Sequence, residues 1–170
     1  MSNQIYSSSD YPNQISSLGF VPANGGIIAT AGTDVSVPAA LTLFNFVGLA
    51  IVDPYGSFSY NAGLFTCVKP GIYKFIFEVT IHNPGGSGNS TYIALLGPST
   101  VVNDSYFNDT RNVLALATVG YYSPNLFYEG YFEVGQQIGL YHRSESTICN
   151  VLRDGLLFPL PSVTYYSSGF

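Results

Sequence analysis

The side chains best suited to covalent or acid–base chemistry are the two cysteines and two histidines of this 170-residue chain: Cys67, Cys149, His82 and His142. A nucleophilic thiol needs a neighbouring base that is itself oriented by a third group. Nothing in the spacing of these four residues brings a thiol to an imidazole. We therefore interpret the cysteines as reduced core residues and the histidines as surface residues, and we predict that the protein is not an enzyme.

Metal and phosphate sites have little support in the sequence. There is no Cys-x₂-Cys or His-x₃-His spacing of the kind that holds zinc. Asp104 and Asp109 lack the alternating ligand rhythm and the glycine of a calcium loop. The glycine-rich segment 83–88 lacks a lysine and precedes an expected strand, so we interpret it as a hairpin connection rather than a phosphate loop. We predict no cofactor, with calcium kept as an alternative.

Tyrosines are frequent in the second half of the chain, at Tyr121, Tyr122, Tyr128 and Tyr131. A tyrosine offers a flat apolar ring with a polar tip, which suits contact with a protein or a carbohydrate. These four residues are our candidate interface or recognition surface. Packing between copies of the chain is the favoured interpretation, and glycan or receptor recognition is the alternative.

Charge is scarce. Charged residues make up 9% of the chain, against roughly 25% in an average globular protein. The 5 basic and 10 acidic residues give a net charge of −5, and no basic run is present to hold nucleic acid. So few charges favour an oligomer that buries part of its surface. We expect no membrane span, because no apolar run approaches about 18 residues, and no classical secretory route, because residues 1–10 lack signal-peptide features.

Short β-branched and aromatic runs recur between Gly, Pro, Asn and Ser clusters from Gly26 onward, which is typical of a β-sandwich or barrel. The expected strands are 27–31, 41–52, 63–68, 72–82, 91–96, 113–121, 126–133, 137–143 and 156–160. The strongest is 72–82, where Tyr73, Phe75 and Phe77 alternate on one face with Val79 and Ile81. This pattern predicts an all-β fold, specifically a jelly roll of two packed sheets.

Residues 1–24 are expected to form an extended arm outside the jelly roll of residues 25–170. Pro12, Pro22 and the pair Gly25-Gly26 should prevent a regular strand from running through this region. The segment nevertheless carries more large hydrophobic residues than a solvating tail usually keeps. We therefore predict that it attaches the protein to a neighbouring particle or coat protein.

The segment 63–79, GLFTCVKPGIYKFIFEV, resembles the globular head of complement component 1q, which shares the tumour necrosis factor jelly roll. The residues that carry the resemblance are Phe58, Gly63, Phe65, Pro70, Gly71, Tyr73, Phe75 and Phe77. In this alignment Pro70-Gly71 turns a hairpin. The segments 91–96 and 135–140 resemble later strands of the family, and 155–158 resembles its closing strand.

The resemblance implies a single jelly-roll β-sandwich that assembles as a homotrimer. Our first interpretation is a structural or adhesive head on a particle surface, such as a virion spike, a minor capsid protein or a spore-coat protein. The alternative is a secreted, extracellular trimeric ligand that binds receptors or glycans. The resemblance leaves the particle and the ligand open.

Overall fold

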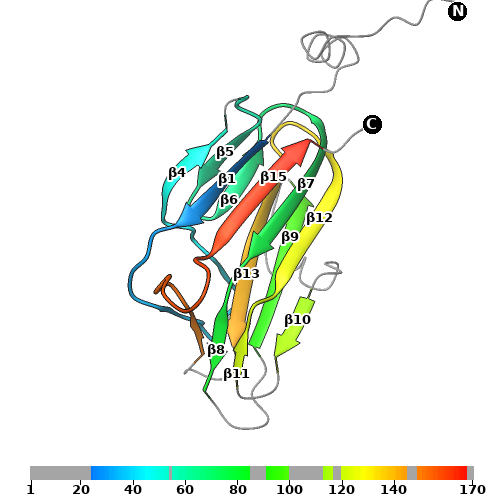
Figure 1. Ribbon diagram of the computed structural model, residues 1–170. Coiled ribbons are helices and arrows are strands. Elements are labelled where there is room, and N and C mark those ends of the chain that lie inside the picture. Colours follow the sequence, from blue (N-terminus) through cyan, green and yellow to red (C-terminus); the bar gives the residue numbers. More distant parts are fainter. Residues whose placement is uncertain are drawn as a thin grey trace, which may run out of the picture.

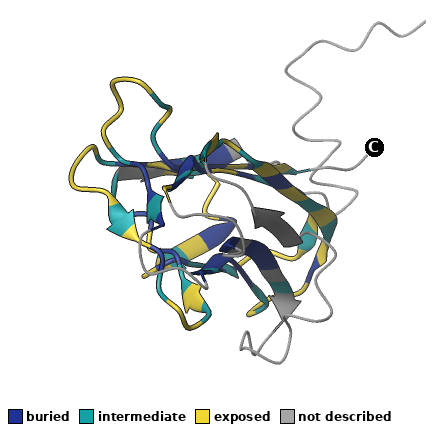
Figure 2. Cartoon of the chain, turned by 90° about the horizontal axis from the view of Figure 1, so that it is seen from below, coloured by how far each residue is buried: buried dark blue, intermediate teal, exposed yellow. Residues whose placement is uncertain are grey.

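The computed structural model describes residues 24–53, 55–84, 91–99, 113–116, 120–144 and 149–167. Every regular element in these ranges is a β-strand, and every pair of neighbouring strands is antiparallel. Two large sheets lie face to face as the layers of a sandwich, with buried residues between them (Figures 1 and 2). The predicted all-β sandwich is confirmed.

The three sheets have these members in spatial order. The five-stranded sheet contains β12 (Asn125–Phe132), β7 (Gly71–Glu78), β15 (Ser162–Ser167), β1 (Asn24–Ala29) and β4 (Gly48–Val52). The six-stranded sheet contains β10 (Val113–Leu116), β9 (Thr91–Ser99), β13 (Gln137–Ser144), β6 (Leu64–Cys67) and β5 (Phe58–Asn61), and β3 (Thr42–Leu43) pairs with β13. The smaller sheet contains β11 (Gly120–Tyr122), β8 (Ile81–Asn83), β14 (Asn150–Val151) and β2 (Val35–Ser36).

Aromatic side chains fill the space between the two large sheets. Tyr73, Phe75 and Phe77 on β7 are each 0% exposed, as the alternation predicts. Phe58 from the facing sheet meets Tyr73 and Phe75 edge-on, at centroid distances of 4.8 and 4.9 Å. Edge-to-face rings are a favourable arrangement and interdigitate without voids. The jelly roll is therefore held by one aromatic core.

Several expected strands have different bounds. The segment 72–82 divides into β7 and β8, and 41–52 divides into β3 and β4 around the buried Phe44 and Phe46. The segment 113–121 divides into β10 and β11. The strand list omits β2, β5 and β14, because each is only two to four residues long and too short to show a period.

The expected hairpin at Pro70-Gly71 is wrong. Strand β6 pairs with β5 and β13, whereas β7 pairs with β12 and β15, so Pro70 and Gly71 carry the chain from one sheet to the other. The tight hairpin lies one strand earlier, between β5 and β6. Its two loop residues, Ala62 and Gly63, have φ values of +47° and +102°, as a two-residue hairpin turn with both residues left-handed requires.

The closing strand is also displaced from its expected position. Residues 156–160 form a loop, and the last strand is β15, which begins at Ser162. Pro159 and Pro161 cannot donate to a β-ladder, and Gly155 has a φ of +67°. These three residues keep the apolar run 156–158 out of the sheet.

Gly25 and Gly26 do not interrupt the chain, contrary to expectation. Both lie within β1 and pair with Tyr165 and Thr164 of β15. A Cβ on Gly25 would lie 2.6 Å from the Tyr165 ring, and one on Gly26 would lie 2.2 Å from the Val163 carbonyl oxygen. Glycine is needed here because β15 approaches too closely for a side chain. Asn24, the last residue of the predicted arm, begins β1, and residues 1–23 lie outside the described ranges.

Candidate self-association surface

The outer face of the five-stranded sheet carries an unusual number of exposed apolar side chains, drawn from all five strands. The exposed large hydrophobic residues on this face, which we call the outer face, are Ile28, Val52, Ile72, Phe127, Tyr131 and Tyr166. The strand registers bring them together, because Phe127 pairs with Ile76 and Tyr131 with Ile72. Along each of these strands, side chains that point outward alternate with side chains that point into the core.

Charged groups on the outer face are engaged with one another or with polar neighbours. Lys74 Nζ lies 4.0 Å from Glu129 Oε2 and 5.7 Å from the centre of the Phe127 ring. The Ser162 hydroxyl donates a 3.0 Å hydrogen bond to Glu78. An exposed ion pair of this kind contributes little to stability. Because Lys74 and Glu129 neutralise each other's charge, an apolar partner that covered them would bury less net charge.

The four candidate tyrosines do not form one surface. Tyr131 lies on the outer face, whereas Tyr128 and Tyr122 are partly buried against the core. Tyr121 is 57% exposed, and its ring stacks with the rings of His82 at 4.3 Å and Phe158 at 4.9 Å, with interplanar angles of 9° and 16°. Tyr121 therefore belongs to a separate aromatic cluster that includes the loop before β15.

The motif residues of the family resemblance serve the core and a crossover. Phe65, Tyr73, Phe75 and Phe77 are each 0% exposed. Pro70 and Gly71 join the two sheets. The Tyr73 hydroxyl donates a 2.7 Å hydrogen bond to the Lys69 carbonyl oxygen, which fixes the chain just before that crossover.

The cysteines are free and buried, as predicted. Burial raises the pKa of the Cys67 thiol to about 11, so the thiolate that nucleophilic chemistry needs is scarce. Thr91 Oγ1 lies 3.0 Å from Cys149 Sγ, and that thiol lies 3.3 Å from Asn83 Oδ1. Within the described ranges neither thiol is hydrogen-bonded to a histidine.

The prediction that both histidines lie at the surface is wrong for His142. This residue on β13 is 4% exposed, its ring meets Phe44 edge-on at 5.5 Å, and its Nδ1 has no hydrogen-bond partner among the described residues. Burial lowers its pKa to about 4 because a charged imidazole is poorly solvated there. The alternation of β13 places it on the core side, and its polar type concealed this in the sequence.

No group of three or more His, Cys, Asp or Glu residues suited to a metal ion occurs among the described residues. Asp104, Asp109 and most of the glycine-rich segment 83–88 lie outside the described ranges. Within those ranges, no helix is long and apolar enough to cross a bilayer.

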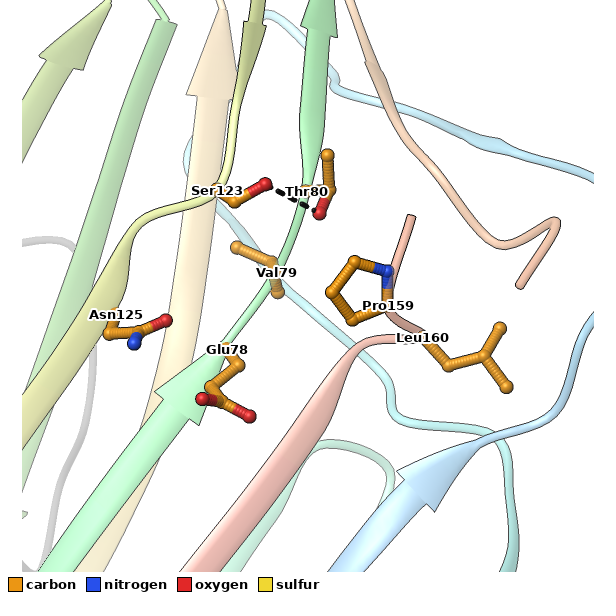
Figure 3. A pocket seen from close by; sticks show the side chains of 7 residues that line it. All are labelled: Glu78, Val79, Thr80, Ser123, Asn125, Pro159 and Leu160. Atoms are coloured by element: carbon orange, nitrogen blue, oxygen red, sulfur yellow. Dashed lines mark hydrogen bonds between the residues drawn. The ribbon is translucent and has the colours of Figure 1, made fainter. Parts of the chain in front are cut away.

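A small pocket lies at the margin of the outer face, where β7 ends and β12 begins (Figure 3). Its volume is about 60 Å³, and its lining includes Glu78, Asn125, Pro159 and the hydrogen-bonded pair Thr80 and Ser123. Pockets for drug-sized ligands are several times larger, roughly 300–1,000 Å³. This hollow can hold one side chain or a few waters, so it does not indicate a substrate site.

The order of strands and the aromatic core can be compared with solved structures. Murine APRIL superposes with a TM-score of 0.59 at 9% identity, covering 87% of this chain and 100% of that one. Eiger TNF from S. frugiperda superposes with a TM-score of 0.55 at 9% identity, covering 88% and 92%. The fold is the tumour necrosis factor-like jelly roll.

The globular domain of zebrafish complement 1qA also matches, at 13% identity and a TM-score of 0.49, over 88% of this chain and 98% of that one. No family model and no curated protein sequence matches the chain. The superpositions on APRIL and Eiger TNF confirm, at the level of the fold, the jelly roll that the residues Phe58 to Phe77 suggested.

Sequence reasoning missed the outer face of this jelly roll, although its signal was present. The alternation that assigned Phe75 and Phe77 to the core also assigned Ile72 and Ile76 to the opposite face. Two apolar residues among polar ones are normal on a surface. Their significance emerges only when the pairing of β12 with β7 adds Phe127 and Tyr131 beside them.

Proposed function

We propose that this protein is a non-enzymatic, homotrimeric jelly-roll head with a structural or adhesive role on a particle surface, attached through residues 1–24. The main observation that supports the proposed trimer is the apolar outer face. Monomers rarely expose contiguous apolar patches larger than a few hundred Å². Six exposed large hydrophobic side chains, drawn from all five strands, lie on this one sheet face.

Buried thiols and a buried histidine support the non-enzymatic part of the proposal. Catalysis by a thiol requires an accessible thiolate beside a base, and Cys67 and Cys149 are 1% and 0% exposed. The particle-surface role is supported by the scarcity of charge and by the apolar content of the arm. Its alternative is the secreted trimeric ligand that binds a receptor or glycan.

Light scattering on the purified full-length chain tests the assembly. We expect a mass near three times 18.3 kDa, stable on dilution. Phe127→Asp should convert the trimer to folded monomer, because it places an unpaired carboxylate in the interface. Val134→Asp, at a 61% exposed residue in the turn between β12 and β13, should leave the trimer intact. A wild-type monomer would contradict the proposal.

Co-sedimentation distinguishes the particle role from the ligand role. The full chain should sediment with particles from its source, and a chain that begins at Asn24 should not. Sedimentation of both chains alike would remove the attachment role from residues 1–24. Absence of the full chain from every particle fraction would favour the ligand.

A further inference from the structure

Three polar side chains stand abreast at the end of β7. Asn125 of β12 and Ser162 of β15 are both paired with Glu78 of β7, one from each side. All three residues alternate with buried neighbours, so their side chains point outward from the same sheet face. Directly paired residues on neighbouring strands bring their Cβ atoms to within about 5.5 Å of each other. The strand register therefore assembles an amide, a carboxylate and a hydroxyl in one row.

Two members of this row, Glu78 and Asn125, line the small pocket at the end of β7 (Figure 3). Thr80 and Ser123 extend its polar side, and their hydroxyl oxygens are joined by a 3.0 Å hydrogen bond. Thr80 is 1% exposed, which fixes this pair against the body of the domain. Four side chains that carry oxygen or nitrogen therefore form the polar side of the pocket.

The opposite side of the pocket is apolar. Pro159 and Leu160, from the loop before β15, line it there, across from Asn125 in Figure 3. The ring of Phe158 stacks on that of Tyr121 at 4.9 Å, which joins the two segments that supply the two sides. A hollow whose walls are already held in place loses little conformational freedom when a ligand binds.

The polar groups of the pocket can both donate and accept hydrogen bonds. The Ser162 hydroxyl donates to Oε2 of Glu78 at 3.0 Å, which leaves Oε1 to accept from a ligand. The Asn125 side chain offers both an NH₂ donor and a carbonyl acceptor. One of the hydroxyls of Thr80 and Ser123 donates to the other, so the second keeps its hydrogen for a ligand. This mixture matches the hydroxyl groups of a sugar, which also donate and accept.

Charged ligands match the pocket less well. An ammonium group only donates hydrogen bonds, so it would leave the donors of the Asn125 amide unused. An anionic ligand would meet the carboxylate of Glu78, and the lining that the structure describes includes no lysine, arginine or histidine to offset it. The chemistry of the lining therefore favours a neutral ligand.

The size of the pocket decides how much of such a ligand can enter. A volume of about 60 Å³ holds a few waters, and hydroxyl groups take about the same room as the waters they replace. The sugar ring must then stay outside the hollow, where Pro159 and Leu160 offer apolar surface to its C–H groups. Ligand groups that reproduce the hydrogen bonds of the displaced waters avoid the loss of affinity that displacement otherwise causes.

We infer that this pocket is a subsite for two neighbouring hydroxyl groups of a neutral sugar at the end of a glycan. Glu78 Oε1 accepts from one hydroxyl, the Asn125 amide pairs with the other, and the ring packs against Pro159. The subsite lies apart from glycan recognition by the four candidate tyrosines. It goes beyond the proposed trimer and particle role and rests on neither, because all of its groups come from one chain.

Saturation-transfer NMR on the full-length chain tests the subsite, with the methyl glycosides of mannose, galactose, fucose and N-acetylglucosamine as probes. We expect at least one of them to bind with a dissociation constant on the order of 1 mM, because a few hydrogen bonds and one apolar contact supply little binding energy. The methyl glycoside of sialic acid, which carries a carboxylate, should bind more weakly. Failure of all four neutral glycosides to bind at concentrations well above this constant would overturn the inference.

Two substitutions of similar size place the binding in the pocket. Glu78→Gln removes the charge of the carboxylate and Asn125→Leu removes the amide, and each should raise the dissociation constant about 10-fold or more. The matched controls are Glu133→Gln, in the turn between β12 and β13, and Asn61→Leu, at the end of β5. Both controls should leave the constant unchanged. A sugar that binds Glu78→Gln and Asn125→Leu as well as it binds the wild type would overturn the site.

Asn125→Asp distinguishes a sugar from the side chain of a protein partner. This substitution removes the amide donor and adds a second carboxylate beside Glu78, so it should weaken glycoside binding and strengthen the binding of a cation. The cationic probe is Nα-acetyl-lysine methylamide. Binding of this probe in place of the glycosides, with higher affinity for Asn125→Asp, would overturn the sugar assignment. A wild-type monomer that binds a glycoside would contradict the proposed trimer and leave the subsite standing.

Discussion

The rings of Phe75 and Tyr165 stack across neighbouring strands, with their centroids 5.1 Å apart and their planes 28° from parallel. The two residues are paired directly in the register of β7 and β15, and both are 0% exposed. Phe58 from the opposite sheet meets both rings at about 5 Å. This three-ring contact is where the two sheets of the jelly roll are joined.

Phe75→Ala should therefore destabilise the fold strongly. Removing a buried phenylalanine costs about 3–5 kcal/mol, which is a large part of the roughly 5–15 kcal/mol that stabilises a domain. We expect loss of soluble trimer, measured by light scattering and by urea unfolding. Lys74→Ala, one residue away on the outer face, should change the free energy of unfolding by less than about 0.5 kcal/mol. Equal losses of stability in Phe75→Ala and Lys74→Ala would mean that the assignment of inward and outward faces to β7 is wrong.

Gly25→Ala should be destabilising even though it adds only a methyl group. The new Cβ would lie 2.6 Å from both the Tyr165 ring and the Val52 carbonyl oxygen, so β1 must shift away from its neighbours at a cost of about 1–3 kcal/mol. The matched control is Gly32→Ala, whose Cβ would come no nearer than 3.7 Å to the Arg153 side chain. Thermal unfolding should show a clear drop for the first variant and little change for the second.

Stability should fall in mild acid because of His142. Its pKa is about 4 in the folded protein and 6.5 for an ordinary histidine. Between these values the unfolded chain binds a proton that the folded chain does not, so stability decreases as the pH falls from 6.5 toward 4, by up to about 3 kcal/mol.

Urea unfolding at a series of pH values measures this effect. His142→Leu should flatten the profile between pH 6.5 and 4, because the leucine has no proton to gain. His82→Leu retains His142 and should therefore retain the slope. An unchanged slope in His142→Leu would assign the acid sensitivity to other groups.

The domain should begin at Asn24. A chain that starts there should fold with the melting temperature of the full protein, because β1 and all its pairings are kept. A chain that starts at Thr30 should fail to fold, since it lacks the strand that joins β15 to β4. Circular dichroism and light scattering on the two truncated chains measure this. If the chain that starts at Asn24 is unfolded, part of residues 1–23 must belong to the folded core.

The native thiols should resist alkylation at neutral pH. Cys67 is buried and its pKa is raised to about 11, so little thiolate is present or accessible. Iodoacetamide followed by mass spectrometry should label neither cysteine in the folded protein and both in urea. Rapid labelling of either cysteine in the folded protein would contradict the prediction that both thiols are inaccessible and unreactive.

Periodicity in the sequence was sufficient to determine the all-β class and the inward face of β7, because successive side chains in a strand point to opposite faces. The burial of both cysteines followed from residue type, since free cysteine is commonly buried. The aromatic residues from Phe58 to Phe77 were also sufficient to suggest the jelly roll.

Only the tertiary structure decided which segments pair. Pro70-Gly71 looked like a hairpin because a proline–glycine turn has the same local chemistry whether the chain returns to the same sheet or crosses to the other. The apolar segment 156–158 looked like a strand, but the flanking prolines and Gly155 place it in a loop whose leucines are exposed. The outer face likewise depends on residues far apart in sequence, such as Ile72 and Tyr131, that become neighbours only through strand register. Register is set by the packing of the whole sandwich, so a local reading of the chain could not reveal this surface.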